Sequence, residues 1–219
     1  MKTHIYLMPG LAASPKIFDY ITFPENLYEV HYLEWIRPTS LDEPLKDYAK
    51  RISKFISEKN VVLIGVSFGG ILVQEISKII NPKKVIIISC VKNSRELPKR
   101  LQFAKISKSY KLFPANNITT FENFISYIFG KMTKKRIEQY KIFLSVRDPL
   151  YLKWAIYNVL HWQQTKTLPN ITHIHGTIDH IFPIKHIKDC IEIQNGAHVM
   201  ILNKAKEINS IILTILKNL

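Results

Sequence analysis

Short runs rich in β-branched residues alternate with helical patterns at both ends of this 219-residue chain. The expected strands cover residues 4–8, 28–35, 61–64, 85–88, 171–175 and 190–193. The run at 61–64 is apolar throughout, which is typical of a parallel strand covered on both faces. This alternation predicts an α/β protein with a mostly parallel sheet flanked by helices. The length suits one domain with a full core.

Apolar residues between these strands recur every three or four positions, which predicts amphipathic helices. We expect the first helix to begin at a capping box, Ser40-Leu41-Asp42-Glu43, in which the Ser40 hydroxyl accepts from the Glu43 amide. The expected apolar face of that helix comprises Leu41, Leu45, Tyr48, Ile52 and Phe55. Further core helices are expected over 68–80 and roughly 204–217.

The alternation breaks between residues 91 and 168, where helical patterns occur without a convincing strand. Two helices are expected around 121–128 and 137–144. A third should begin at Asp148-Pro149, because Asp148 supplies an N-cap acceptor and Pro149 suits the first helical position. The predicted organisation is a core of residues 1–90 and 169–219 with a helical cap, 91–168, inserted into it.

The motif Gly65-Val66-Ser67-Phe68-Gly69 joins the buried strand at 61–64 to the helix at 68–80. In that context G-x-S-x-G forms a nucleophile elbow. The turn is so tight that side chains two positions before and after the serine would collide. The Ser67 hydroxyl would lie at a helix N-terminus, where amides and the helix dipole favour developing negative charge. The alternative is a structural turn with an idle serine.

A serine nucleophile needs a base, and the base needs an acid to orient it. Three aspartates lie downstream of Ser67. Asp148 is accounted for as an N-cap, and Asp189 precedes a strand, where we expect it to be solvated. Asp179 follows the end of the strand at 171–175, and ligands of α/β proteins gather outside such strand ends. We therefore favour Asp179 as the acid.

The base must come from eight histidines. We favour His198, because it lies in a loop between the last strand and the last helix. Packed roles are expected for the histidines within strands, namely His4, His31, His173 and His175. No cysteine or carboxylate at metal-ligand spacing supports a zinc cluster of His173, His175, His180 and His186. We therefore expect no metal site.

These motifs resemble the α/β-hydrolase superfamily almost from end to end. The elbow, an acid loop ending at Asp179 and a base loop ending at His198 follow the family's order. Met8-Pro9-Gly10-Leu11 resembles the family's oxyanion loop, which implies that the backbone N–H groups of Leu11 and Phe68 bind the oxyanion. Pro9 stands where the family commonly has a histidine before this glycine, so the chain departs from the family's pattern at that position.

The resemblance implies a sheet of about six strands, because the chain starts at the family's third strand. It also implies hydrolysis of an ester, thioester or related small acyl substrate through an acyl-enzyme, with no cofactor. Two alternatives keep the same fold, which does not determine function. One is a lyase, and the other is a ligand-binding protein with an idle triad.

The formal net charge of +14 is concentrated in the expected cap. Residues 91–168 contain 15 lysines and arginines but four acidic residues, together with 13 of the 24 aromatic residues. We expect a substrate that combines an apolar acyl part with a negative charge; the alternative is a solvated, lysine-rich surface. No nucleic-acid partner is expected, because arginine, which phosphate recognition favours, is scarce.

The remaining features concern location. Cys90 and Cys190 are expected to be reduced thiols, since two cysteines cannot form a framework of disulfides. No export signal is visible. The longest apolar stretch, 61–73, is interrupted by glycine and serine and is shorter than the ~20 residues of a membrane span. We expect a cytoplasmic protein; its oligomeric state is not predicted.

Overall fold

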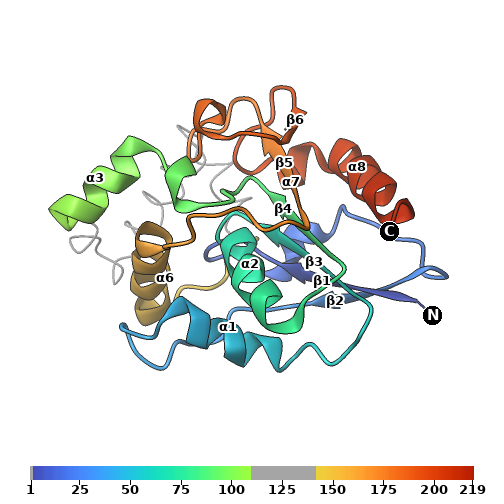
Figure 1. Ribbon diagram of the computed structural model, residues 1–219, viewed down its shortest axis with the longest axis horizontal. Helices are drawn as coiled ribbons and strands as arrows, with labels where there is room; N and C mark the ends of the chain where they lie inside the picture. Colours follow the sequence, from blue (N-terminus) through green and yellow to red (C-terminus); the bar gives the residue numbers. More distant parts are fainter. Residues whose placement is uncertain (1, 110–141) are drawn as a thin grey trace.

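The computed structural model describes residues 2–109 and 142–219, and a six-stranded parallel sheet lies at its centre (Figure 1). The strands are β1 (Thr3–Met8), β2 (Tyr28–Tyr32), β3 (Val61–Val66), β4 (Lys84–Ile88), β5 (Ile171–Gly176) and β6 (Ile191–Ile193). All five pairings are parallel, in the order β2-β1-β3-β4-β5-β6. The expected sheet is thus confirmed, although β2 ends at Tyr32 rather than near Trp35.

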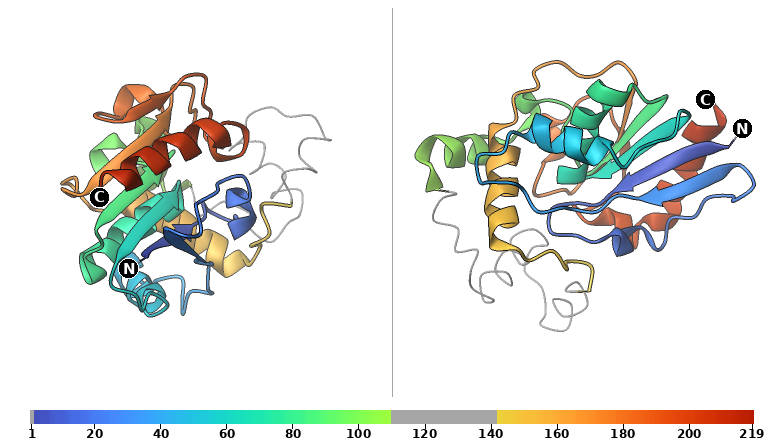
Figure 2. Two further views of the ribbon diagram at one scale, coloured as in Figure 1. Left: turned by 90° about the vertical axis from the view of Figure 1, so that its right-hand side faces the viewer. Right: turned by 90° about the horizontal axis from the view of Figure 1, so that it is seen from below.

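Helices cover both faces of the sheet. The described helices are α1 (Leu45–Ser53), α2 (Phe68–Ile80), α3 (Lys99–Ser107), α6 (Pro149–His161), α7 (Met200–Asn203) and α8 (Ala205–Lys217), of which α3 packs on α6 rather than on the sheet. Short 3-10 turns occur at Pro15–Phe18, Ser94–Glu96 and Ile184–His186. Figure 2 shows α1 and α2 on one face and α8 on the other. The layered arrangement leaves the carboxyl ends of the strands at one edge, which is where the candidate site lies.

The chain changes direction across the sheet at β1 and β3. From β1 it moves outward to β2, and it then returns past β1 to β3 and continues to β6. The pairing sets Met8 opposite Gly65, so the segments that follow β1 and β3 begin side by side. Such a reversal point is where α/β sheets form ligand crevices. Every residue of β3 is buried, as its apolar sequence predicts.

The predicted capping box of α1 is wrong. The helix begins at Leu45 after Pro44, and Glu43 instead accepts from the Thr39 amide at 2.7 Å. The reason is steric, because a residue before proline is disfavoured in the helical conformation. Glu43 is buried and also pairs with Arg51 Nη1 at 2.8 Å. Of the expected apolar face, Leu45, Tyr48 and Ile52 are buried, whereas Leu41 and Phe55 lie outside the helix and are exposed.

The expected cap can be compared with the structure only in part. Helix α6 begins as predicted, with Asp148 accepting from the Tyr151 amide at 2.8 Å and Pro149 in the first turn. The helix expected at 121–128 and most of that at 137–144 lie outside the described residues. Phe143 and Leu144 are described and are not helical. The division into core and cap therefore stays a prediction.

Two further features concern the cysteines and the length of the helices. Cys90 and Cys190 are both free thiols, as expected. Among residues 2–109 and 142–219, no helix is long and apolar enough to cross a membrane.

The N-cap of α6 leads to a stability prediction. Asp148→Ala should lower the free energy of unfolding by about 1 kcal/mol, because the Tyr151 amide loses its acceptor. Asp148→Asn should lower the free energy of unfolding only slightly, since asparagine is as good an N-cap as aspartate. Chemical denaturation of both variants checks this, and equal losses in both would point to the exposed Arg37–Asp148 ion pair instead.

Candidate active site

Ser67 occupies a tight turn between β3 and α2, with φ 52° and ψ −119°. A positive φ is rare for a residue with a side chain. Neighbouring backbone lies too close for side chains, because a Cβ on Gly65 would be 2.5 Å from the Gly69 carbonyl oxygen. A Cβ on Gly70 would be 2.6 Å from Cys90 Sγ, so α2 also lies close to β4. The steric reason predicted for Gly65 is therefore confirmed, whereas a Cβ on Gly69 would instead collide with the Pro9 carbonyl oxygen.

The structure brings Ser67, His198 and Asp179 together. Ser67 Oγ lies 2.9 Å from His198 Nε2, and His198 Nδ1 lies 2.9 Å from Asp179 Oδ2. The three residues follow β3, β6 and β5 respectively, so all come from the carboxyl edge of the sheet. The second carboxylate oxygen, Oδ1, accepts from the amides of Ile181 and Phe182 at 2.7 and 2.9 Å. These two bonds fix the orientation of the Asp179 carboxylate.

The environment of Asp179 keeps its carboxyl group ionised. Burial raises the pKa of Asp179, but the adjacent His198, together with His175 and the Phe182 amide, outweighs burial and leaves the pKa below its ordinary value. An ionised carboxylate only accepts hydrogen bonds, so the proton of His198 is on Nδ1. Its Nε2 therefore presents a lone pair to the Ser67 hydroxyl. This is the tautomer that general-base chemistry requires.

Two buried histidines lie behind the acid loop. His175 Nε2 donates to the Phe182 carbonyl at 2.8 Å, so its Nδ1 must accept from His173 Nε2 at 3.0 Å. Burial lowers the pKa of both rings, which are therefore neutral at pH 7. The predicted packed role of these histidines is confirmed. In the described part of the chain they form no metal-ligand group with His180 or His186.

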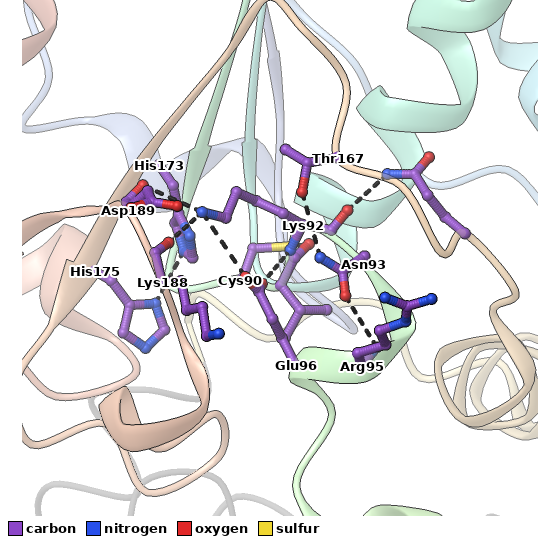
Figure 3. A network of polar contacts seen from close by, with 12 residues as sticks. Cys90, Lys92, Asn93, Arg95, Glu96, Thr167, His173, His175, Lys188 and Asp189 are labelled. Atoms are coloured by element: carbon purple, nitrogen blue, oxygen red, sulfur yellow. Dashed lines mark hydrogen bonds and ion pairs between the residues drawn. The ribbon is translucent and has the colours of Figure 1, made fainter.

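A buried ion pair holds the loop that leads into β6 (Figure 3). Lys92 Nζ donates to the carbonyl oxygens of Lys188 and Asp189, and it lies 3.7 Å from Glu96 Oε1. Burial raises the pKa of Glu96, while Lys92 opposes that shift. The segment after β4 is thus joined to the segment before β6. The side chain of Asp189 is exposed, as expected for a residue that is not the acid.

The loop after β1 lies against the elbow. A Cβ on Gly10 would be 3.5 Å from Ser67 Cβ, so the two segments are in contact. Among the described residues, no group accepts a hydrogen bond from the backbone N–H of Leu11 or of Phe68. Neither amide is thus engaged by another described residue.

Aromatic side chains that were not predicted from the sequence brace this loop. Trp35 Nε1 donates to the Gly10 carbonyl at 2.8 Å, and the Ala12 amide donates to the Tyr151 hydroxyl at 3.3 Å. The Trp35 indole also stacks on the Phe68 ring, with centroids 4.9 Å apart and planes 6° apart. These contacts hold the loop although Pro9 stands where histidine is usual. No local pattern in the sequence links residues 10, 35 and 151.

An apolar pocket opens beside the serine. Ser67 and His198 form part of its wall, and the rest is lined largely by aliphatic side chains such as Ile17, Leu144 and Ile201. Its volume is about 50 Å³, so it suits a short hydrocarbon group with the serine hydroxyl at its edge.

Comparison with known proteins gives similarity at the level of structure. No family model matches the sequence, and no curated protein matches it. A lipase-esterase related protein from Clostridium acetobutylicum superposes with a TM-score of 0.66 at 17% identity, covering 97% of this chain and 93% of that one. A hydrolase from Oleispira antarctica superposes with a TM-score of 0.71 at 12% identity, covering 100% of this chain and 92% of the hydrolase.

A thermophilic esterase from Thermogutta terrifontis gives a TM-score of 0.62 at 13% identity, covering 100% of this chain and 90% of the esterase. These identities are low, whereas the coverage extends over whole chains, so the similarity concerns the architecture. Together with the parallel six-stranded sheet and its flanking helices, it establishes that this chain has the α/β-hydrolase fold.

Proposed function

We propose that this protein is a serine hydrolase that cleaves an ester, thioester or related small acyl substrate through an acyl-enzyme. The observation that carries the proposal is the continuous chain of contacts from Ser67 Oγ through His198 to Asp179, with both links at 2.9 Å. The similarity in fold to an esterase and to a lipase-esterase related protein supports the same class.

In the proposed reaction, Ser67 Oγ attacks the substrate carbonyl carbon while His198 Nε2 takes the hydroxyl proton. The carbonyl oxygen becomes an oxyanion, and the N–H groups of Leu11 and Phe68 donate to it. His198 then passes the proton to the leaving oxygen or sulfur as the bond to the acyl carbon breaks. Asp179 remains ionised and stabilises the imidazolium.

The acyl-enzyme is resolved by the same groups. His198 Nε2 takes a proton from water, and the resulting hydroxide attacks the ester carbonyl carbon. Collapse of the second tetrahedral intermediate breaks the bond to Ser67 Oγ, which recovers its proton from His198. The products are the carboxylic acid and the free enzyme. No cofactor takes part in this scheme.

The substrate is proposed to combine an apolar acyl part with a negative charge. The pocket beside Ser67 supports the apolar part, because aliphatic side chains line it. The excess of lysine and arginine between residues 91 and 168 supports the anionic part, since clustered positive charge raises the local concentration of anions. We propose that acyl chain and charge are recognised by separate regions of the protein.

Replacement of the serine tests the proposed nucleophile. Ser67→Ala should lower kcat by about 10⁶-fold and abolish labelling by a fluorophosphonate, because no other group attacks the carbonyl. The midpoint of thermal unfolding should hardly change. Ser77→Ala is the matched control, since Ser77 lies in α2, the helix that follows Ser67, and its hydroxyl donates to the Gln74 carbonyl of that helix. Labelling that persists in Ser67→Ala would refute the assignment, as would a wild-type serine that does not label.

Replacement of the acid tests the proposed role of Asp179. Asp179→Asn should lower kcat by about 10⁴-fold with the fold retained, because the amide favours the wrong tautomer of His198. Asp148→Asn is the control and should leave kcat unchanged, because Asp148 caps α6. Steady-state kinetics with an activated ester measures both. A large loss in the control together with a mild loss in Asp179→Asn would contradict the choice of acid.

The charge of the substrate can be tested with two esters that share one acyl chain, one anionic and one neutral. We expect kcat/KM to favour the anionic ester at low ionic strength, because positive charge steers it to the site. The preference should shrink as salt shortens the Debye length from about 30 Å at 0.01 M to about 8 Å at 0.15 M. A ratio that does not respond to salt would show that the lysines are only a solvated surface.

A further inference from the structure

Two histidines and two glutamates meet at the edge of the sheet, at the amino-terminal end of β1. In the parallel register His4 of β1 lies opposite Glu29 of β2, and Tyr6 lies opposite His31. Opposed residues of paired strands project from the same face of a sheet, as do residues two apart along one strand. His4, Glu29 and His31 therefore share one face. The proposed hydrolytic mechanism uses none of them.

The three side chains present potential ligand atoms to one another. His4 Nδ1 lies 3.0 Å from His31 Nε2. The Glu29 carboxylate faces both rings, with Oε2 3.8 Å from His4 Nδ1 and Oε1 3.9 Å from His31 Nε2. Within residues 2–109 and 142–219, no other three groups of metal-ligating type offer atoms this close together.

The spacing fits a metal ion bound by two imidazoles. With metal–nitrogen distances of about 2.0–2.1 Å, nitrogens 3.0 Å apart subtend an angle of roughly 90° at the metal. The Glu29 oxygens, 3.8 and 3.9 Å from these nitrogens, must move inward to complete a three-sided set at similar bond lengths. Glu29 can make that movement, because its side chain is half exposed.

The second ring nitrogen of His4 has a partner of the kind that metal ligands usually have. His4 Nε2 lies 3.8 Å from Glu58 Oε2. Histidines that bind metals commonly direct the other ring N–H to a carboxylate, which sets the tautomer and raises the basicity of the ligand. A small movement of the exposed Glu58 side chain would let it accept from Nε2–H, which would leave Nδ1 of His4 for the metal.

The orientation of the second ring is also held by packing. His31 stacks on Tyr6 with centroids 4.4 Å apart and planes 14° apart, and Tyr6 is buried. The His31 ring also stacks with the His4 ring, with centroids 5.3 Å apart. A ligand set that is ordered before binding loses less conformational entropy when a metal binds.

We propose that His4, Glu29 and His31 bind a divalent first-row transition metal, of which Zn²⁺ is the probe for testing. Imidazole suits such ions, and the remaining positions of the metal would be open to water because the cluster reaches the surface. The ion joins the edge strand β2 to β1. Met8, beside the elbow, lies four positions along β1 from His4, or about 13 Å away, so the proposed role is structural.

Metal binding is tested on the full chain after treatment with a chelator. Titration calorimetry with Zn²⁺ should show one equivalent bound. The thermal midpoint should rise by about 5–10 °C at a Zn²⁺ concentration ~100 times the Kd. The bound ion should leave hydrolytic activity unchanged.

Variants separate this site from chance binding. His31→Gln should abolish the one-equivalent binding, and Glu58→Gln should weaken it by about 10–100-fold. His186→Gln is the matched control and should bind as the wild type does. Glu29→Gln, at a half-exposed position, provides a second ligand variant if His31→Gln does not fold.

Two outcomes would overturn the proposal. Absence of Zn²⁺ binding would mean that His4 and His31 only share a hydrogen bond. Zn²⁺ binding that survives both His31→Gln and Glu29→Gln, or that His186→Gln removes, would place the ion elsewhere on the protein. The absorption of bound Co²⁺ gives an independent measure, because loss of an imidazole ligand changes its spectrum.

Discussion

The backbone at Ser67 is held in a conformation that costs about 1–3 kcal/mol for a residue with a side chain. The surrounding structure maintains it. The Ser67 amide donates to the Ile88 carbonyl at 2.9 Å, which ties the turn to β4, and β3 is buried along its whole length. Because β3 and the hydrogen bond to β4 both hold the turn, the hydroxyl, the Phe68 amide and the start of α2 all have fixed positions. The distance from Ser67 Oγ to His198 and the contact between Ser67 and the loop after β1 depend on these positions.

The parts of the fold and site that could be predicted from the sequence are those with local causes. The elbow requires glycine within a few residues of Ser67 in the sequence. The ends of the strands place Asp179 and His198 at one edge of the sheet whatever the details of packing. The start of α6 was predictable for the same reason, since Asp148 caps the turn that follows it. The capping box of α1 failed because Pro44, one residue beyond the motif, overrides it.

Contacts between distant segments could not be predicted in this way. The brace on Gly10 comes from Trp35, beyond the end of β2, and the acceptor for the Ala12 amide comes from Tyr151 in α6. The His4–His31 pair depends on the register of β1 and β2, which periodicity alone does not determine. Such features arise from tertiary packing, and no spacing along the chain indicates them.

Helix α6 and the residue that follows it are attached to the rest of the protein by polar contacts of aromatic side chains as well as by packing. Besides the Tyr151 contact, Trp154 Nε1 donates to the Glu43 carbonyl and Trp162 Nε1 to Glu75 Oε1, at 2.8 and 2.7 Å. A chimera that exchanged residues 91–168 for the equivalent segment of another protein would therefore lose three anchors at once. An exchange that ended before Asp148 would keep all three of these contacts.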